Sequence, residues 1–230
     1  MPLLSIIVPV FNEEATIHAV VARLREAPFS IAREILLVND GSTDGTRAAL
    51  DAIVAGDDVR AIHAAANGGK GSAVRLGLHH ARGEIIAIQD GDLELDPRDL
   101  VTLVAPILRH EADVVYGSRF LNGRPPAPLP TVIANRFLTS LTNVLYGANL
   151  TDMETCYKVM RTEVARSLEL KANRFDIEPE ITAKLLRAGH RIIERPVRFE
   201  PRSHAAGKKI RWRDGVHAVT TLVRERLRRS

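Results

Sequence analysis

The chain has 230 residues, 45% hydrophobic and 26% charged, which are the proportions of an ordinary soluble globular protein. Glycine (15 residues) and proline (12 residues) are near average, which excludes collagen-like, repetitive and disordered chains. The single cysteine, Cys156, cannot form an internal disulfide, and no apolar run approaches the roughly 20 residues of a membrane-spanning helix. The apolar N-terminus lacks a basic region and a cleavage site, so we expect a soluble, cytoplasmic chain without a signal peptide.

The net charge of +4 conceals an asymmetry between the two halves of the chain. Residues 1–110 carry 10 Lys and Arg against 15 Asp and Glu, whereas residues 111–230 carry 22 against 13. The basic excess is concentrated in residues 195–230, with 11 basic and 3 acidic residues. It indicates either a solvated basic face or a surface for phosphate groups. Aromatic residues make up only 4% and do not alternate with the basic ones, which argues against a nucleic-acid partner.

The first half of the chain alternates between predicted strands and predicted helices. Short apolar runs with β-branched residues predict strands at 5–10, 34–40, 59–64, 84–90 and 112–118. Helical spacing of apolar residues predicts helices from Asn12 or Glu13, from about Thr46, at 72–80 and at 97–109. This alternation predicts an α/β fold, with a mainly parallel sheet and helices on both of its faces. Ligands of such sheets bind at the carboxyl ends of the strands.

The second half has longer helices and less regular spacing. The proline-rich residues 124–130 predict a mobile connection. Apolar residues largely on one side predict an amphipathic helix at 131–146, and we slightly favour its packing on the sheet over contact with lipid. Further helices are expected at 178–188 and 212–229, with an edge strand at 191–202.

Polar segments follow several of the predicted strands. PVFNEE, after the first strand, lacks the G-x-G-x-x-G of dinucleotide-binding proteins. Asp40 ends the second strand, where it is a candidate for ligand binding or for an Asx turn. NGGKGSA, at residues 67–73, is not a Walker A loop, because Ala64 stands where that motif needs glycine. It remains a glycine-rich turn that would bring Lys70 near an anionic ligand.

The segment QDGDLELDP is the strongest chemical signal. Asp90 ends an apolar strand, and Gly91 separates it from Asp92. Two carboxylates at the rim of a parallel sheet suit Mg²⁺ or Mn²⁺, which binds one or two carboxylates together with water and phosphate oxygens. The alternative is ordinary turn chemistry after a strand, since such triplets are common.

Together these segments resemble the family 2 glycosyltransferases, and among them the dolichyl- or polyprenyl-phosphate mannosyltransferases. The motifs that carry the resemblance span nearly the whole chain: IIVPVFNEE, LLVNDGSTDGT, NGGKGSAVRLG, IAIQDGDLELDP, VVYGSR, TDMETCYKVMR and RSHAAGK. The resemblance implies a single domain of the GT-A type over residues 1–230. Residues 1–118 would bind the nucleotide-sugar and residues 119–230 the acceptor.

The resemblance also implies roles for individual residues. The base and ribose would be held by Pro9, Phe11, Glu13, Val38 and Asp40. The metal and diphosphate would be bound by Asp90, Gly91, Asp92 and Glu94, where the family often has Gln in place of Glu94. The cationic contacts to phosphates would come from Lys70, Arg119, Arg202 and Lys208.

A lipid phosphate acceptor requires no general base. A phosphate monoester is mostly a dianion at pH 7 and is itself a nucleophile. Catalysis then depends on alignment and on stabilising the leaving diphosphate, and attack from the opposite face inverts the anomeric carbon. We expect Asp92, Arg119 and Asp152 to be catalytic, Asp152 by holding the sugar or orienting the acceptor, with a helix N-cap as the alternative. The acceptor phosphate would contact Arg119, Arg136 and Arg202, and surface solvation is the alternative for Arg136.

The predicted reaction is an inverting, metal-dependent transfer of a hexose, with mannose from GDP-mannose preferred, onto a polyprenyl phosphate. UDP-glucose or UDP-N-acetylglucosamine as donor, or a soluble acceptor, would use the same framework. A non-catalytic nucleotide-sugar-binding subunit is the rival of another class. The basic flank predicts attachment to the inner face of an anionic membrane, directly through helix 131–146 or the C-terminal helix, or through a membrane partner protein.

Overall fold

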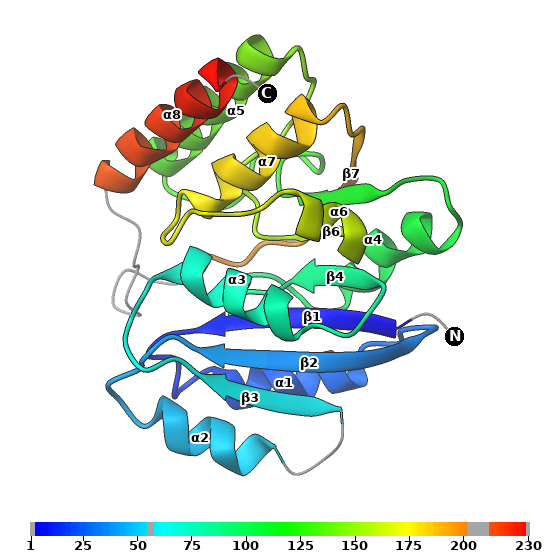
Figure 1. Cartoon of the computed structure of the whole chain (residues 1–230), viewed down its shortest axis with the longest axis vertical. Coiled ribbons are helices and arrows are strands. Elements are labelled where there is room, and N and C mark those ends of the chain that lie inside the picture. The colour runs from blue at the N-terminus through cyan, green and yellow to red at the C-terminus, as the bar shows by residue number, and fades with distance from the viewer. Residues whose placement is uncertain (1–2, 55–57, 202–211, 229–230) are drawn as a thin grey trace.

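The computed structural model describes residues 3–54, 58–201 and 212–228. Its centre is a seven-stranded sheet with the strand order β3-β2-β1-β4-β6-β5-β7 (Figure 1). The strands are β1 (Leu3–Val10), β2 (Ala32–Asn39), β3 (Val59–His63), β4 (Ile85–Ile88), β5 (Val114–Ser118), β6 (Lys158–Arg161) and β7 (Ile192–Pro196). The helices are α1 (Ile17–Glu26), α2 (Thr46–Ile53), α3 (Lys70–His80), α4 (Asp99–Leu108), α5 (Leu129–Tyr146), α6 (Thr162–Ser167), α7 (Ile177–Arg187) and α8 (Trp212–Leu227).

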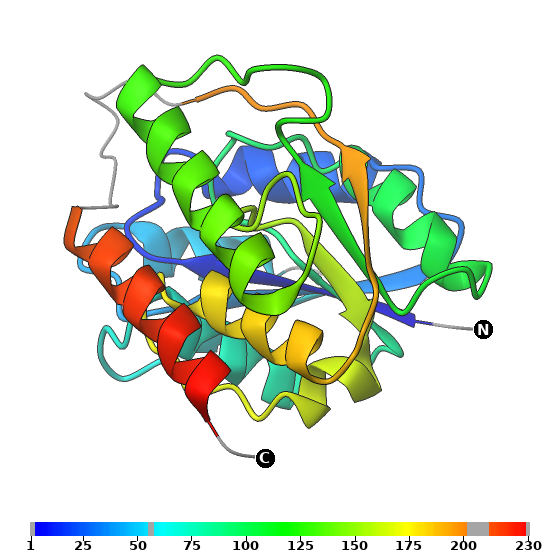
Figure 2. The same ribbon diagram turned by 90° about the horizontal axis from the view of Figure 1, so that it is seen from above.

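Apolar side chains point alternately to the two faces of the sheet, and on each face they pack against helices. Leu4, Ile6 and Val8 of β1 pack into one hydrophobic cluster with α1, α2 and α4. Ile7 points the other way, into a second cluster with α3, α6 and α7. Figures 1 and 2 show these two helical layers on opposite sides of the sheet. The predicted α/β fold with helices on both faces is confirmed.

Six strands of the sheet run in one direction, and β6 runs against them. β4 and β5 both pair with β6 in antiparallel register, while the pairs β1·β2, β1·β4, β2·β3 and β5·β7 are parallel. The carboxyl ends of the six parallel strands and the start of β6 therefore lie along the same edge of the sheet. Residues that precede β6 reach the same edge as residues that follow β4.

Helices α5 and α8 form an additional layer beside the sheet. They lie side by side in both ribbon views (Figures 1 and 2), and Leu138, Ala218 and Leu222 share a small buried cluster. The hydroxyl of Tyr146 donates a hydrogen bond to the carbonyl of Leu222 (2.7 Å). Among the described residues, no helix is long and apolar enough to cross a membrane.

Several boundaries differ from those predicted. α1 begins at Ile17, four or five residues later than expected, and α3 begins at Lys70. α5 begins at Leu129, so the helix takes up the end of the proline-rich segment, with Pro130 in its first turn, where proline is tolerated. The predicted strand at 191–202 is confirmed as the edge strand β7, although it ends at Pro196. β6 and α6 were not predicted.

Candidate active site

Three loops with polar residues meet at the carboxyl edge of the sheet. They are the glycine-rich loop 67–69 before α3, the segment 90–94 after β4, and the segment 151–157 before β6. Arg119 follows β5 at the same edge. The loops come from strands that are far apart in sequence, and the strand order brings them together.

Asp40 anchors the glycine-rich loop from the end of β2. Its Oδ1 accepts a hydrogen bond from the N–H of Gly68 (2.9 Å), and its Oδ2 accepts one from the N–H of Gly69 (2.7 Å). The side chain is buried, which raises the pKa of Asp40, while the two backbone donors oppose that rise. Asp40 was predicted to hold base or ribose, but in this structure both of its oxygens hold the loop.

The loop leads into α3 through close backbone contacts. A Cβ on Gly71 would stand 2.4 Å from the carbonyl oxygen of Ala172. The N–H of Gly71 donates to the carbonyl of Arg174 (3.2 Å), and the N–H of Ser72 donates to that of Asn173 (3.0 Å). Glycine is therefore required where α3 starts, and the first turn of the helix is fixed against residues 172–174.

The segment after β4 is tied to the loop after β1. The hydroxyl of Thr16 donates to the carbonyl of Gly91 (2.9 Å) and lies 2.8 Å from Oε2 of Glu13. Asp92 accepts a hydrogen bond from the N–H of Glu94 (3.1 Å), which closes a turn. Asp90 and Asp92 are both partly exposed, so their carboxylates are accessible at the edge of the sheet.

Lys70, the first residue of α3, is bound between two carboxylates. Its Nζ lies 2.6 Å from Oδ1 of Asp90 and 2.7 Å from Oε1 of Glu178, at the start of α7. Burial opposes the charged form, but the two carboxylates outweigh it and raise the pKa of Lys70. The three residues join the glycine-rich loop, the segment after β4 and α7 in a single ionic contact.

The carboxylates after β4 are chemically suited to a hard divalent cation. The ammonium of Lys70 beside Asp90 shows that this position already holds a positive charge. Within the part of the chain that the structure describes, no group of three or more His, Cys, Asp or Glu side chains is arranged to bind a metal ion. The predicted set of Asp90, Asp92 and Glu94 is thus not gathered as three ligands, whereas two carboxylates with phosphate and water oxygens would satisfy Mg²⁺.

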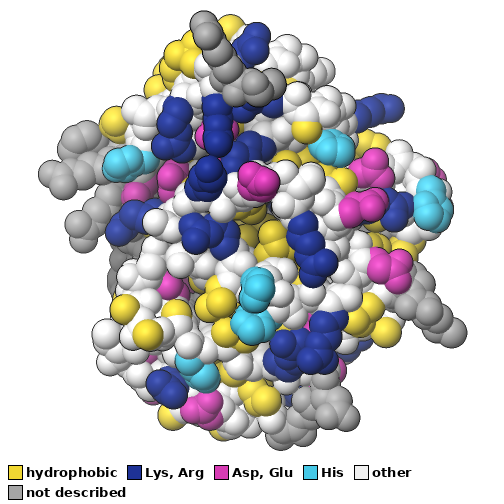
Figure 3. All heavy atoms as spheres, viewed as in Figure 1, with side chains coloured by type: hydrophobic (Ala, Val, Ile, Leu, Met, Phe, Trp, Pro, Cys, Tyr) yellow, Lys and Arg dark blue, Asp and Glu magenta, His cyan; other side chains and the backbone are white. Residues whose placement is uncertain are grey.

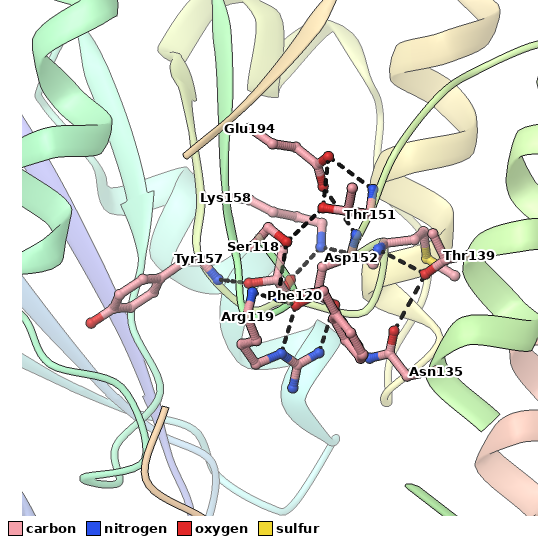
Figure 4. Close-up of polar contacts among 12 residues, drawn as sticks. Ser118, Arg119, Phe120, Asn135, Thr139, Thr151, Asp152, Tyr157, Lys158 and Glu194 are labelled. Carbon is pink, nitrogen blue, oxygen red and sulfur yellow. Dashed lines mark hydrogen bonds and ion pairs between the residues drawn. The ribbon is translucent and has the colours of Figure 1, made fainter. Parts of the chain in front are cut away.

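Arg119 and Asp152 form a two-point ion pair at the end of β5 (Figure 4). Nε of Arg119 lies 2.7 Å from Oδ2 of Asp152, and Nη2 lies 2.8 Å from Oδ1. The backbone N–H of Arg119 and the side-chain amide of Asn135 in α5 also donate to Asp152. The carboxylate of Asp152 is fully buried, and it raises the pKa of Arg119 further above its usual range despite the burial of the guanidinium. No helix begins after Asp152, so the N-cap alternative is wrong.

Two further charged residues hold the segment that contains Asp152 (Figure 4). The carboxylate of Glu194 in β7 accepts hydrogen bonds from the N–H groups of Thr151 (2.8 Å) and Asp152 (3.0 Å). The ammonium of Lys158 donates to the carbonyls of Met153 and Thr155. The position of Asp152, and through it that of Arg119, is therefore set by residues of β6 and β7.

Glu154 lies in the same segment, and one oxygen of its carboxyl group, Oε1, is buried and lacks a hydrogen-bond partner among the described residues. Burial, strengthened by the nearby carboxylate of Glu178, raises the pKa of Glu154 to about 7. Burial also lowers the pKa of Lys158, to about 8. The site thus contains a carboxyl group that changes its charge near neutral pH.

The remaining predicted residues lie at different depths. Val38 has no exposed surface, and its side chain packs in the second hydrophobic cluster; its contact with the base or ribose stays a prediction. Arg136 is exposed on α5, with its guanidinium 5.7 Å from the ring centre of Phe120. Pro9 and Phe11 are partly exposed at the end of β1. Arg202 and Lys208 lie outside the described residues.

Four charged or ionisable residues of the site were missed in the sequence. They are Glu154, Lys158, Glu178 and Glu194. Lys158 comes directly before the apolar pair Val159 and Met160 in a buried strand, and this was the available signal. Glu194 stands in a partly exposed edge strand, where a charge is ordinary. Glu178 gives no such signal, because its partner Lys70 is more than 100 residues away.

Comparison with known sequences identifies the family. A sequence model of "Glycosyl transferase family 2" matches residues 5–168. The dodecaprenyl-phosphate galacturonate synthase of Rhizobium johnstonii is 31% identical over 89% of this chain, which spans only 61% of that protein. The undecaprenyl-phosphate mannosyltransferase of Micrococcus luteus is 31% identical over 88% of this chain and 85% of its own length.

Solved structures share the fold at lower identity. Glucosyl-3-phosphoglycerate synthase from Mycobacterium tuberculosis, in complex with Mn²⁺, uridine diphosphate and phosphoglyceric acid, superimposes with a TM-score of 0.75 at 19% identity. That match covers 100% of this chain and 80% of the other. Staphylococcus aureus TarS in complex with UDP-GlcNAc gives a TM-score of 0.64 at 19% identity, over 98% of this chain and 66% of the other. The fold is that of the GT-A glycosyltransferases, and the chain belongs to glycosyltransferase family 2.

Proposed function

We propose that this chain transfers a hexose from a nucleoside-diphosphate sugar to a polyprenyl phosphate, with inversion at the anomeric carbon. The observation that carries the proposal is the meeting of Asp90 and Asp92 with the Arg119–Asp152 pair at one edge of the sheet. One site would then contain the acidic groups that bind a metal and a diphosphate, and the guanidinium of Arg119, which would bind a second phosphate. The similarity to two polyprenyl-phosphate glycosyltransferases supports the same acceptor class.

Residues 1–118 would bind the donor. Asp90 and Asp92 would hold Mg²⁺ or Mn²⁺ against the diphosphate. A bound cation would neutralise the charge that develops on the leaving nucleoside diphosphate. Lys70 is a further positive charge near that leaving group.

Residues 119–230 would bind the acceptor. The acceptor phosphate carries its own nucleophilic oxygen, so the protein must align it rather than deprotonate it. Arg119 is suited to this task, because Asp152 fixes its guanidinium at two points. Asp152 itself is buried under Arg119, which makes it a positioning residue for the phosphate-binding arginine. Arg136 lies farther out on α5, where it would meet the acceptor before Arg119 does.

We further propose that the acceptor is reached from a membrane surface, with the chain attached at the inner face. Large apolar side chains on α5 and α8 point outward, among them Ile133 (58% exposed), Phe137 (59%) and Val144 (82%). Such exposure on adjacent helices marks an interaction surface. Figure 3 shows lysine and arginine side chains gathered over the half of the molecule that holds α7 and α8, which suits anionic lipid. Ile133, Phe137 and Val144 thus do not pack on the sheet as favoured from the sequence, whereas Leu138 of the same helix is buried in the cluster shared with α8.

Mannose from GDP-mannose is the donor we propose first, in line with the mannosyltransferase relative. The galacturonate synthase relative and the structural neighbours with uridine nucleotides make a UDP-sugar the alternative. The same neighbour contains phosphoglyceric acid, which keeps a soluble phosphate acceptor as the second candidate.

Transfer from radiolabelled donors tests the proposal. GDP-mannose, UDP-glucose and UDP-N-acetylglucosamine are offered with a short polyprenyl phosphate, with Mg²⁺ or Mn²⁺ or with EDTA. Label should enter the organic phase from one donor, and EDTA should abolish this transfer. Label in the lipid without a metal requirement would contradict the metal site. No labelled lipid from any donor, despite metal-dependent nucleotide binding, would favour a soluble acceptor.

A further inference from the structure

Lys70 is nearly buried between two carboxylates. Its side chain is only 12% exposed and contacts carboxylates with exposures of 30% (Asp90) and 7% (Glu178). The two contacts are equally short, at 2.6 and 2.7 Å. One of the two partners is a proposed metal ligand, and the other belongs to α7, away from the segment after β4.

The backbone of Lys70 offers little freedom. The adjacent Gly68 and Gly69 are bound by Asp40, and Gly71 and Ser72 are bound by the carbonyls of residues 173 and 174. The ammonium can therefore change position mainly by rotation of its own side chain. Glu178 already contacts it, so it can leave Asp90 without losing every partner.

A divalent cation on Asp90 would meet this ammonium at close range. Two cations sharing one carboxylate repel each other, and the repulsion is strong where water is scarce. Lys70 lies between Asp90 and Glu178, so a metal on Asp90 can displace the ammonium only if the lysine side chain turns toward Glu178.

We propose that Lys70 is an internal counter-ion, which occupies Asp90 when no divalent cation is bound and is retained by Glu178 alone when the cation binds. The inference rests on the proposed function, because it takes Asp90 as a metal ligand. It implies that the metal binds weakly to the nucleotide-free chain. A nucleoside diphosphate would bring the negative charge that lets both cations remain, so metal and nucleotide would bind together.

The decisive variant removes the ammonium without changing the net charge. Lys70→Met combined with Glu178→Gln loses one positive and one negative charge, and it leaves Asp90 without the lysine. Binding of Mn²⁺ alone, followed by the electron paramagnetic resonance signal of the free ion, should become at least about tenfold tighter than in the wild type. The control is Arg174→Met, which removes an exposed cation beside Gly69 and lowers the net charge by one. Although this loss of charge alone favours cations, its Mn²⁺ affinity should change much less.

Equal Mn²⁺ affinity in the double variant and the wild type would overturn the proposal, as would equal tightening in the Arg174→Met control. Circular dichroism establishes that each variant is folded, and Lys70→Gln is the second variant if the double one is not. The Mn²⁺ affinity of the Lys70→Gln variant should also be higher than that of the wild type. A separate titration with GDP or UDP present tests the proposed function. If Mn²⁺ fails to bind the wild type even then, the metal site itself is wrong, whatever Lys70 does.

Discussion

The charged side chains at the edge of the sheet are largely held by other parts of the chain. Arg119 is held by Asp152, Lys70 by Asp90 and Glu178, and the carboxylate of Asp40 by the glycine-rich loop. A substrate that binds these side chains, as proposed, would exchange the contacts for its own, which lowers the net free-energy gain from each new ion pair. In return the groups are oriented in advance, which is what electrostatic catalysis needs.

Asp92→Asn tests the acidic segment directly. The substitution keeps the size of the side chain and removes the charge proposed to bind the cation. Transfer of label to polyprenyl phosphate should fall by about a hundredfold or more, with a melting temperature close to that of the wild type. Asp96→Asn is the matched control four residues away, where the carboxylate serves a turn and contacts Arg198. Equal activity in the two variants would show that the metal site has been assigned to the wrong residues.

Glu154 should make stability depend on pH. Burial raises its folded pKa from 4.5 to about 7, so between these values the folded chain binds more protons than the unfolded one. The stability contributed by Glu154 is thus complete below pH 4.5 and is lost as the pH rises through 7. Glu154→Gln mimics the protonated form, and its melting temperature should fall less than that of the wild type between pH 5 and pH 8, by roughly 2–5 °C. Glu163→Gln, at an exposed position of α6, should behave like the wild type. Parallel curves for all three proteins would contradict the raised pKa.

At the scale of helices and strands, the periodicity of apolar residues predicted the elements that pack in the hydrophobic core. Continuous apolar runs predicted the positions of β1, β2 and β4, because both faces of each strand are buried. β6 was missed because it has only four residues and begins with a buried lysine. The outward apolar side of α5 was misjudged, since spacing alone does not say whether a hydrophobic stripe meets the sheet or solvent. Asp90 and Asp92 were recognisable because they follow a strand, whereas Lys158 and Glu178 depend on contacts between distant segments.

The exposed stripe on α5 should be needed for attachment to vesicles. Ile133→Glu combined with Phe137→Glu places two charges on its outer side, where neither residue supports the core. Co-flotation with anionic vesicles at low salt should drop by about tenfold. Ala22→Glu with Ala48→Glu adds the same charge at exposed positions of α1 and α2 and should have a smaller effect. If the α5 variant floats like the wild type, or if the wild type does not float at all, direct attachment through α5 is wrong.

At the scale of the whole molecule, both parts of the site depend on one continuous sheet. The proposed donor side lies on β1, β2 and β4, and the proposed acceptor side on β5, β6 and β7; the β4·β6 pair joins them. A ligand that contacts the donor loops therefore stabilises the folded chain as a whole.

The correct nucleoside diphosphate with Mn²⁺ should raise the melting temperature. At a ligand concentration about 100 times the dissociation constant, the expected shift is roughly 5–10 °C. Mn²⁺ or nucleotide alone should give a smaller shift, and EDTA should reverse the combined one. GDP and UDP are compared side by side, so the larger shift identifies the preferred base. A shift of equal size without metal would contradict the cation bridge between the acidic segment and the diphosphate.

The antiparallel strand β6 also has a consequence for synthesis of the chain on the ribosome. Ala87 of β4 pairs with Val159, which is translated 72 residues later. At translation rates of about 5–20 residues per second, the apolar IIAI edge of β4 waits several seconds without its neighbour. An unpaired apolar edge is a template for aggregation, so nascent chains that end between β4 and β6 should be the ones that chaperones retain most strongly. The junction that completes the candidate active site is then also a late step in building the sheet, followed only by the addition of β7.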